Sequence, residues 1–391
     1  MILRLTRTYR LVSLSLLAAL LAGTAAQAPR LLAQDSQTQT TPDEGGPQSD
    51  SGSIILKKKK DADEPPPPPA PAEPKVKNPN NETYSIRVDV PVVTLDVNVI
   101  LDKTHQFVPG LKAGNFQVLE DGVPQTVTSI RTTQAPITAV MLLEFASNSW
   151  YAINDMENAS YVFFRSLRPE DYVAVMTYDL RTHIVSDFTN NKDVVGQSLQ
   201  SLTIPTFSDT NLFDALYETL DRVSRIEGRK YIILIGTGRD TFSKLTLDKI
   251  IAKVKSTPNV TIFSIATGAF IQEIAEAQGG MGMGASIRNM DYLQAQNQLK
   301  TFAQLTGGLY FAPIFEGELP EDFAQINNSI RNQYVLTYRP TNTRNDGSYR
   351  KIKVSLVDNE GKPLQMVDEK HKPLKYSVIA RDGYRAKLPV E

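Results

Sequence analysis

The chain has 391 residues and almost balanced charge, with 42 lysines and arginines against 43 aspartates and glutamates. The length leaves room for two domains or more, and the charge balance excludes a global positive field that would attract nucleic acid. The sequence contains no cysteine, which excludes disulfides, thiolate metal sites and cysteine nucleophiles.

Residues 1–33 have the order of a secretory signal peptide. Arginines come first, an apolar run from Leu11 to Ala22 follows, and small residues end the segment. The apolar run is short for a stable membrane span. We expect these residues to direct export, which would make the protein secreted or periplasmic; an uncleaved membrane anchor is the alternative.

Residues 34–80 are polar and rich in proline, including the run Pro65 to Pro69. Such a composition cannot bury enough apolar surface to offset the entropy of ordering, so the segment is predicted to be a disordered linker. The run Lys57 to Lys60 is either solvated or in contact with an anionic cell surface. The second alternative would associate the protein with the cell envelope.

Residues 81–135 and 329–391 both predict strands. "YSIRVDVPVVTLDVNVIL" is rich in β-branched residues and alternates polar with apolar positions, and "FQVLEDGVPQTVTSI" has a hairpin signal at Asp121-Gly122. Strands and short turns follow again in "QYVLTYRP", "DGSYRKIKVSLVD" and "KYSVIARDGYRA". Because each segment alone is short for an independent core, we predict one β-sandwich built from both.

Residues 136–328 alternate between apolar strands and amphipathic helices. The strands include "ITAVMLLEF", "YVAVMTYD", "KYIILIGT" and "VTIFSIATG", and "LFDALYETLDRVSRI" is one of the helices between them. This alternation predicts an α/β domain with a mostly parallel sheet and helices on both faces. The domain would be inserted in the β-sandwich, and its ligand site is expected at the carboxyl ends of the strands.

The order of these segments resembles the von Willebrand factor type A domain, particularly the "VWFA-related" secreted proteins of acidobacteria. The resemblance covers residues 86–386 and rests on "VDVPVVTLDVNVILDKTHQFVPGLKAGNFQVLEDGVPQTVTSI", "LRPEDYVAVMTYD", "TNLFDALYETL", "KYIILIGTGRDT" and "RDGYRA". It implies a Rossmann-like fold for the inserted domain and a protein as binding partner.

The resemblance also implies the position of a metal-ion-dependent adhesion site. Metal-binding type A domains use an Asp-x-Ser-x-Ser loop, a threonine from a second loop and an aspartate from a third, because magnesium-like cations prefer hard oxygen ligands. In "LLEFASNSW" one alignment puts Glu144 at the aspartate and Asn148 at the second serine. The other alignment recovers Ser147 and Ser149 but puts Phe145 at the aspartate.

The other two loops keep part of this pattern. Thr210 in "SDTNLFDAL" matches the family threonine, whereas Thr237 in "IGTGRDT" stands at the third-loop aspartate, with Asp240 close behind it. The loss of both aspartates removes charge on which cation affinity depends. We predict a degenerate site without a cofactor; the alternative is magnesium or manganese held by Glu144, Asn148 and Thr210.

Catalysis is not expected from this sequence. Ser147 and Ser149 lack the Gly-x-Ser-x-Gly elbow of a serine nucleophile. The histidines His105, His183 and His371 stand at no metal-ligand spacing. The protein is therefore predicted to be non-enzymatic.

The first function hypothesis is an exported binding protein for adhesion or another protein interaction, with no nucleic-acid partner. Its binding loops would carry Glu144, Ser147, Asn148, Ser149, Thr210, Thr237 and Asp240. The alternative is a structural or assembly component of the cell envelope in which the type A domain only packs. A magnesium-dependent adhesion domain and a hydrolase are the remaining alternatives.

Overall fold

The computed structural model describes residues 76–77, 83–84, 91–132, 136–147, 153–202, 205, 207–268 and 284–388. All of them belong to the compact unit Lys75–Glu391, whereas the unit Met1–Pro74, with the predicted signal peptide, lies outside the described residues. Strands β1 (Val76–Lys77) and β2 (Thr83–Tyr84) pair antiparallel. Strand β1 thus falls within the segment predicted as a linker.

The central sheet has six strands in the order β12-β11-β10-β7-β8-β9. These are β7 (Thr138–Glu144), β8 (Tyr172–Tyr178), β9 (Thr182–Thr189), β10 (Lys230–Gly236), β11 (Val260–Ala266) and β12 (Tyr310–Phe311). All neighbours are parallel except β9, which runs antiparallel to β8. Counted within this domain, the order is 6-5-4-1-2-3, which is the doubly wound order of Rossmann-like sheets.

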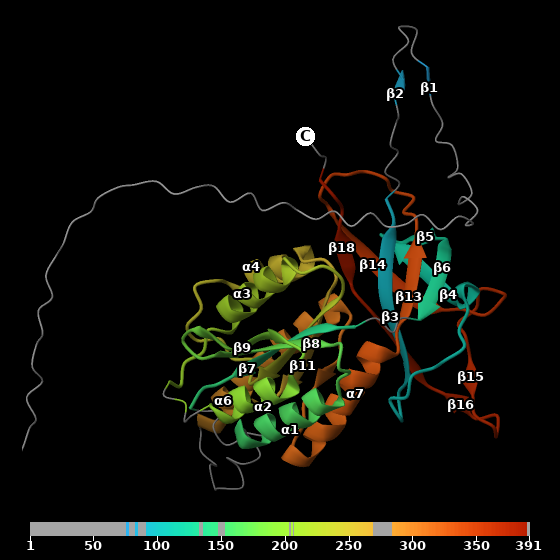
Figure 1. Ribbon diagram of the computed structural model, residues 1–391. Helices are drawn as coiled ribbons and strands as arrows, with labels where there is room; N and C mark the ends of the chain where they lie inside the picture. The colour runs from blue at the N-terminus through green and yellow to red at the C-terminus, as the bar shows by residue number, and fades with distance from the viewer. Residues whose placement is uncertain are drawn as a thin grey trace, which may run out of the picture. The chain divides into compact units, whose positions relative to one another are not determined.

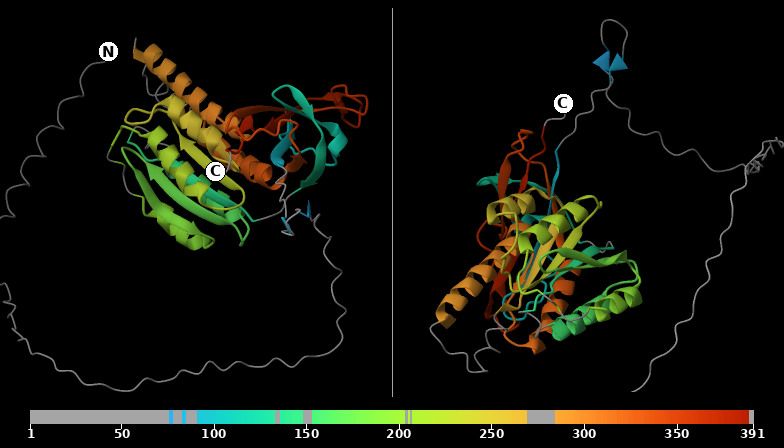
Figure 2. Two further views of the ribbon diagram at one scale, coloured as in Figure 1. Left: turned by 90° about the horizontal axis from the view of Figure 1, so that it is seen from above. Right: turned by 90° about the vertical axis from the view of Figure 1, so that its left-hand side faces the viewer.

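Helices cover both faces of this sheet (Figure 1, Figure 2). One face carries α1 (Ile153–Ser166), α2 (Lys192–Gln200) and α7 (Leu319–Arg331); the other carries α3 (Leu212–Ser224), α4 (Leu247–Ser256) and α6 (Gly284–Thr306). Met141 and Leu142 of β7 face opposite cores, so both faces of the strand are apolar. None of the described helices is long and apolar enough to span a bilayer.

The remaining strands form two four-stranded sheets, β17-β3-β13-β6 and β18-β14-β4-β5. Their bounds are β3 (Val93–Leu101), β4 (Phe116–Glu120), β5 (Val123–Gln125), β6 (Val127–Thr132), β13 (Tyr334–Tyr338), β14 (Tyr349–Leu356), β17 (Tyr376–Ala380) and β18 (Gly383–Arg385). A short hairpin, β15 (Met366–Val367) with β16 (Pro373–Leu374), and the 3-10 turns η1 (Ala113–Asn115) and η3 (Glu316–Glu318) complete the elements.

The two sheets enclose one apolar core between them. Strand β3 lies between β13 and β17, so a strand from the N-terminal side of the α/β domain is held by two strands from its C-terminal side. The predicted fold class is therefore confirmed: a Rossmann-like domain is inserted in a β-sandwich that both flanking segments form. The exact domain limits remain predictions, and α7 continues to Arg331, past the expected limit at 328.

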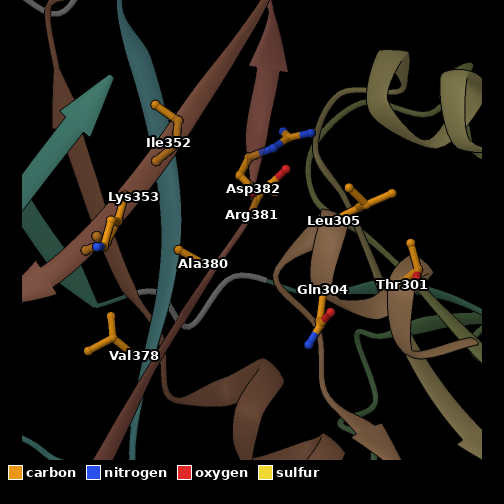
Figure 3. A pocket seen from close by; sticks show the side chains of 10 residues that line it. Thr301, Gln304, Leu305, Ile352, Lys353, Val378, Ala380, Arg381 and Asp382 are labelled. Carbon is orange, nitrogen blue, oxygen red and sulfur yellow. The ribbon is translucent and has the colours of Figure 1, made fainter. Parts of the chain in front are cut away.

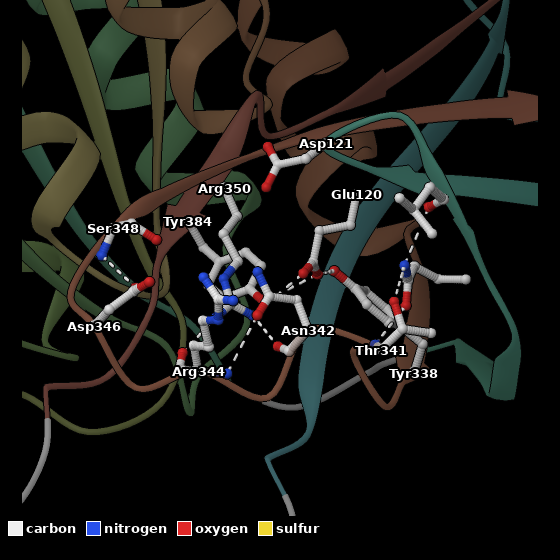
Figure 4. A network of polar contacts seen from close by, with 12 residues as sticks. Glu120, Asp121, Tyr338, Thr341, Asn342, Arg344, Asp346, Ser348, Arg350 and Tyr384 are labelled. Atoms are coloured by element: carbon white, nitrogen blue, oxygen red, sulfur yellow. Dashed lines mark hydrogen bonds and ion pairs between the residues drawn. The ribbon is translucent and has the colours of Figure 1, made fainter.

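A buried polar network joins the two flanking segments inside the sandwich (Figure 4). Glu120 and Arg350 are each 2% exposed, and the Arg350 guanidinium lies 3.2 Å from Glu120 Oε1. The hydroxyls of Tyr338 and Tyr384 donate to Glu120 Oε2 at 2.6 and 3.0 Å. Arg350 also donates to the carbonyl of Asn342. The charges are thus paired and hydrogen-bonded, as buried charges must be.

Candidate functional site

The central sheet reverses its strand order between β7 and β10, and a ligand crevice is expected at the carboxyl ends of the strands at such a point. Glu144 ends β7, and Thr237 directly follows β10. We call residues 144–147, 207–211 and 237–243 the rim. The rim contains the predicted binding-loop residues Glu144, Ser147, Thr210, Thr237 and Asp240. Asn148 and Ser149 lie outside the described residues.

The Glu144 side chain points into the domain rather than out of the rim. The residue is 1% exposed. Its Oε2 accepts hydrogen bonds from the backbone N–H of Thr237 at 2.7 Å and from Thr237 Oγ1 at 2.8 Å. The Tyr178 hydroxyl donates to the same oxygen at 3.4 Å. Because hydrogen bonds to an ionised acceptor are the stronger kind, Glu144 fastens the end of β7 to the end of β10.

The strand pleat and a neighbouring glycine account for this inward direction. Leu142 and Val140 of β7 face the core beneath α3, α4 and α6, and side chains repeat every second residue, so Glu144 turns to the same side. On the adjacent strand, a Cβ at Gly236 would lie only 2.7 Å from Glu144 Oε2. The missing side chain of Gly236 leaves the space through which Glu144 reaches Thr237.

Tyr178 is the third member of this buried cluster. Burial raises the pKa of Tyr178 well above its usual value, and the neighbouring Glu144 raises it further. The phenol therefore stays protonated and serves as an O–H donor to the carboxylate. Sequence analysis missed Tyr178, although it ends "YVAVMTY" directly opposite Glu144 in the β7–β8 register. Aligning the ends of the two parallel strands could have identified it.

Thr210 is connected to the same cluster through the backbone of Arg239. The Thr210 hydroxyl donates to the Arg239 carbonyl at 2.8 Å, and the Arg239 N–H donates to Thr237 Oγ1 at 3.2 Å. The Thr210 N–H donates to Thr241 Oγ1 at 2.9 Å. The structure thus brings Glu144, Thr210 and Thr237 together, as expected from two strand ends and the loop before α3. Both threonines are buried, at 1% and 0% exposure.

Asp240 supports the adjoining loop rather than the buried cluster. Its Oδ1 accepts hydrogen bonds from the N–H of Phe213, in the first turn of α3, at 3.1 Å and from Ser243 Oγ at 2.5 Å. Burial raises the pKa of Asp240, while these hydrogen bonds oppose the shift. An acidic group close to a helix N-terminus is stabilised by the helix dipole. The role that fits this geometry is to hold residues 239–243 against α3.

Two phenylalanines form the apolar part of the rim. Phe207 is 48% and Phe242 58% exposed. The Phe207 carbonyl accepts from the Ser147 N–H at 2.7 Å, and the Phe242 N–H donates to the Thr210 carbonyl at 2.9 Å. Sequence analysis missed both, although each is an aromatic residue within a polar loop, in "TFSD" and "DTFSK". Exposed aromatic residues at a sheet's ligand edge are typical of protein contacts.

The oxygen atoms that the structure describes at the rim are not arranged as ligands of a divalent cation. A magnesium or manganese site needs carboxylates and hydroxyls that converge on one open point. Here Glu144 is turned toward Thr237, and the hydroxyl of Thr210 points its hydrogen at a carbonyl. Within the described ranges, no group of three or more His, Asp or Glu side chains could hold a metal ion. We therefore derive no chemistry from a metal.

No family model matches this sequence, and no curated protein matches it. Solved structures do resemble the fold. A von Willebrand factor type A protein from Catenulispora acidiphila shares 11% identity over 78% of this chain and 76% of its own, with a TM-score of 0.39. The type A domain of the type V pilus tip protein Mfa5 from Porphyromonas gingivalis shares 14% identity over 51% of this chain and 96% of its own, with a TM-score of 0.34.

A third similar structure holds a metal. Proximal thread matrix protein 1 from the mussel byssus, solved with zinc in its adhesion-site motif, shares 11% identity over 51% of this chain and 49% of its own, with a TM-score of 0.38. At these sequence identities the similarity is one of backbone fold, and it gives no information about what this chain binds. The fold that the resemblance to the type A domain implies, a mostly parallel sheet with helices on both faces, is the one that the strand order and the two cores show. The acidobacterial group named with it remains a prediction.

Proposed function

We propose that this chain is an exported, non-enzymatic binding protein that contacts another protein through the rim, at or outside the cell envelope, without a metal ion. The observation that carries the proposal is the burial of Glu144. Its carboxylate is committed to Thr237 and Tyr178, so the acid at the metal-site position serves the interior of the domain. The adhesion site is then degenerate, and binding relies on surface residues.

The exposed chemistry of the rim supports contact with a protein. Phe207 lies in the same loop as Thr210, and Phe242 lines a groove of about 490 Å³. Two cations, Arg181 and Lys244, and two acids, Asp214 and Glu218, line the same groove. An aromatic side chain among charges of both signs suits a protein surface that is partly apolar and carries complementary charges, because aromatic anchors supply area and charges supply orientation.

The non-enzymatic part of the proposal is supported by the surroundings of Ser147 and His183. The Ser147 N–H bonds the Phe207 carbonyl, and the His183 ring lies 3.4 Å from Asp179 on the same edge hairpin. Neither arrangement pairs a hydroxyl nucleophile with a base, which is the geometry that serine chemistry needs. A fluorophosphonate probe that labels the purified chain stoichiometrically would contradict this part.

The rim is tested by a photoreactive amino acid placed at Phe242. Benzoylphenylalanine at 242 should form a covalent product with the partner when the full chain is incubated with envelope proteins of its source. The matched control is the same residue at Ile184 of β9, which is 48% exposed but outside the rim. A product that forms equally from both positions, or from neither, contradicts the proposal; a product from 242 alone is identified, purified and bound again directly.

The proposal that the rim binds its partner without a metal ion is tested separately. Magnesium or manganese titrated into the full chain should produce no binding heat and no rise in melting temperature. A saturable heat that disappears in Glu144→Ala would restore the magnesium-dependent alternative. Export is tested separately, by the presence of the mature chain in periplasm or medium and its retention in the cytoplasm when residues 1–33 are deleted.

A further inference from the structure

One edge of the β-sandwich ends in a strand beside whose outer backbone groups the described residues place no other strand. Asp102 N donates to the Lys375 carbonyl at 3.0 Å, which fixes the register of β17 on β3. Because backbone groups of an antiparallel strand alternate in direction, residues 377 and 379 bond β3. Val378 and Ala380 direct their N–H and C=O groups away from β3. Strand β17 is therefore an open edge.

The facing strand of the second sheet is open in the same region. Asp121 N donates to the Lys351 carbonyl at 2.9 Å, so residues 351, 353 and 355 bond β4 and Val354 points its backbone groups outward. Strand β18 covers only residues 349–351, and a last bond runs from Ile352 N to the Asp382 carbonyl at 2.8 Å. Among the described residues, no strand pairs with the outer edge of β14 beyond this point.

A groove of about 520 Å³ lies between these two strands and the C-terminal turns of α6 (Figure 3). Ile352, Val378 and Ala380 line its sandwich side, and Leu305 of α6 lies across from them. Val354 belongs to the same lining. Val354 and Val378 are half-buried members of the sandwich core. The groove thus offers unpaired backbone donors and acceptors together with an apolar floor, which are the two requirements for adding an extended strand.

The charges around the groove indicate which strand would fit. Lys353 and Arg381 line it against a single acid, Asp382. Lys351 and Lys375 flank the two open strands and are exposed. Lysines on an open edge disfavour pairing with a second copy of the same edge, because like charges would meet. The same lysines attract an acidic chain.

We propose that this groove binds an extended peptide segment of another protein, which pairs with the edge of β17 and carries acidic residues beside Lys353. The peptide backbone would bond Val378 and Ala380, and its inward side chains would cover Val354. This surface is separate from the rim and does not depend on the function proposed for it.

A fluorescent nine-residue peptide, Asp-Asp-Val-Thr-Val-Thr-Val-Asp-Asp, tests the proposal by anisotropy with the full chain. We expect saturable binding that weakens at least about tenfold in Val378→Pro, which removes the outward N–H while leaving the β3 ladder intact. Val367→Pro is the matched control, because Val367 is an exposed strand residue outside the groove whose N–H also points away from its partner strand, and this variant should bind within about threefold of wild type. Thermal unfolding of each variant checks the fold.

A charge exchange keeps the test decisive if Val378→Pro fails to fold. Lys353→Glu should weaken the acidic peptide several-fold and strengthen a version in which lysines replace its aspartates. Equal binding of the acidic and basic peptides to wild type, or binding of neither, overturns the proposal. Light scattering of the full chain provides a further outcome that overturns the proposal. If the chain forms a dimer that Val378→Pro abolishes, the groove is occupied by a second copy of the chain and not by a peptide of another protein.

Discussion

Glu144 shows how one buried carboxylate can join two neighbouring strands. In one of the two alignments this residue stands at the aspartate of the metal-binding pattern; in the structure its carboxylate crosses the space left by Gly236 and accepts hydrogen bonds from Thr237. An acid that is buried and bonded by a neighbouring strand contributes to stability, because hydrogen bonds to a charged acceptor are the stronger kind.

Glu144→Gln should therefore destabilise the domain. The amide oxygen can take the place of Oε2 and keep these donors, but the hydrogen bonds lose the assistance of the charge, and the amide N–H then faces the Thr237 hydroxyl. The expected cost is about 1–2 kcal/mol. Urea unfolding of wild type and variant measures the difference. Asp209→Asn is the matched control, because Asp209 also accepts from a threonine hydroxyl, Thr241, but is exposed. An unchanged midpoint in Glu144→Gln would show that the carboxylate is dispensable.

The orientation of Glu144 could not be predicted from the sequence. The gathering of Glu144, Thr210 and Thr237 was expected because the resemblance to the type A domain assigns their three loops to one edge of a mostly parallel sheet. The inward turn depends on which strand lies beside β7 and on the gap at Gly236, and both are properties of the sheet order. The aromatic character of the rim was missed for another reason: Phe207 and Phe242 match no motif.

At the scale of elements, helix α7 carries an acid whose burial favours its neutral form. Asp322, in the first turn of α7, is 9% exposed, and its Oδ2 is buried without a hydrogen-bond partner among the described residues. Burial raises the pKa of Asp322 to about 7, and the nearby Glu318 and Glu321 add to the shift. Unfolding returns this group toward its usual pKa of 3.8.

The free energy of unfolding should therefore fall as pH rises from about 4 to about 7. In that window the folded protein binds more protons than the unfolded chain, so the stabilisation is full below the unfolded pKa and is lost as pH rises through the folded one. Asp322→Asn should be more stable than wild type at pH 8, by about 1–3 kcal/mol, and equal to it near pH 4. Asp193→Asn, which removes an exposed acid from the first turn of α2, is the control and should leave the slope nearly unchanged.

The strands of the sandwich depend on the buried pair of Glu120 and Arg350. Arg350→Met would leave the Glu120 carboxylate charged, buried and held only by two tyrosine hydroxyls, which should cost about 3–5 kcal/mol. The double variant Glu120→Gln, Arg350→Met removes both charges and should recover a large part of the loss. Chemical denaturation of the four proteins measures the coupling, and strictly additive losses would argue against a paired role.

At the scale of the whole molecule, most of the architecture was predictable from the sequence. Period-two and helical patterns identified the inserted domain, and the shortness of the two flanking segments predicted that they share one sandwich. The open edges of β14 and β17 were not predictable, because an edge exists only once the partners of every strand are known. The same holds for the junction at which α6 meets the turn between β17 and β18.

That junction permits a last prediction. Gly307 has φ +79°, and a Cβ there would lie 2.6 Å from the backbone nitrogen of Arg381, while Asp382 N donates to the Leu305 carbonyl at 3.2 Å. Gly307→Ala should strain the helix end and also push the sandwich strand away, which lowers the melting temperature. Gly361→Ala provides the control, since Gly361 has φ +80° and open space around its Cβ. It carries the same backbone strain without the clash.

The difference in melting temperature between the two variants measures how much the junction contributes to stability. Both should lose about 1 kcal/mol from the left-handed backbone alone. Gly307→Ala should lose more and, in scanning calorimetry, should broaden or split the unfolding transition relative to wild type, because two bodies joined by a packed contact unfold together only while that contact holds. Equal melting temperatures for the two variants would mean that the inserted domain and the sandwich are coupled through other contacts, such as the Arg229–Asp96 ion pair and the Asn98–Ser329 hydrogen bond, and not through the end of α6.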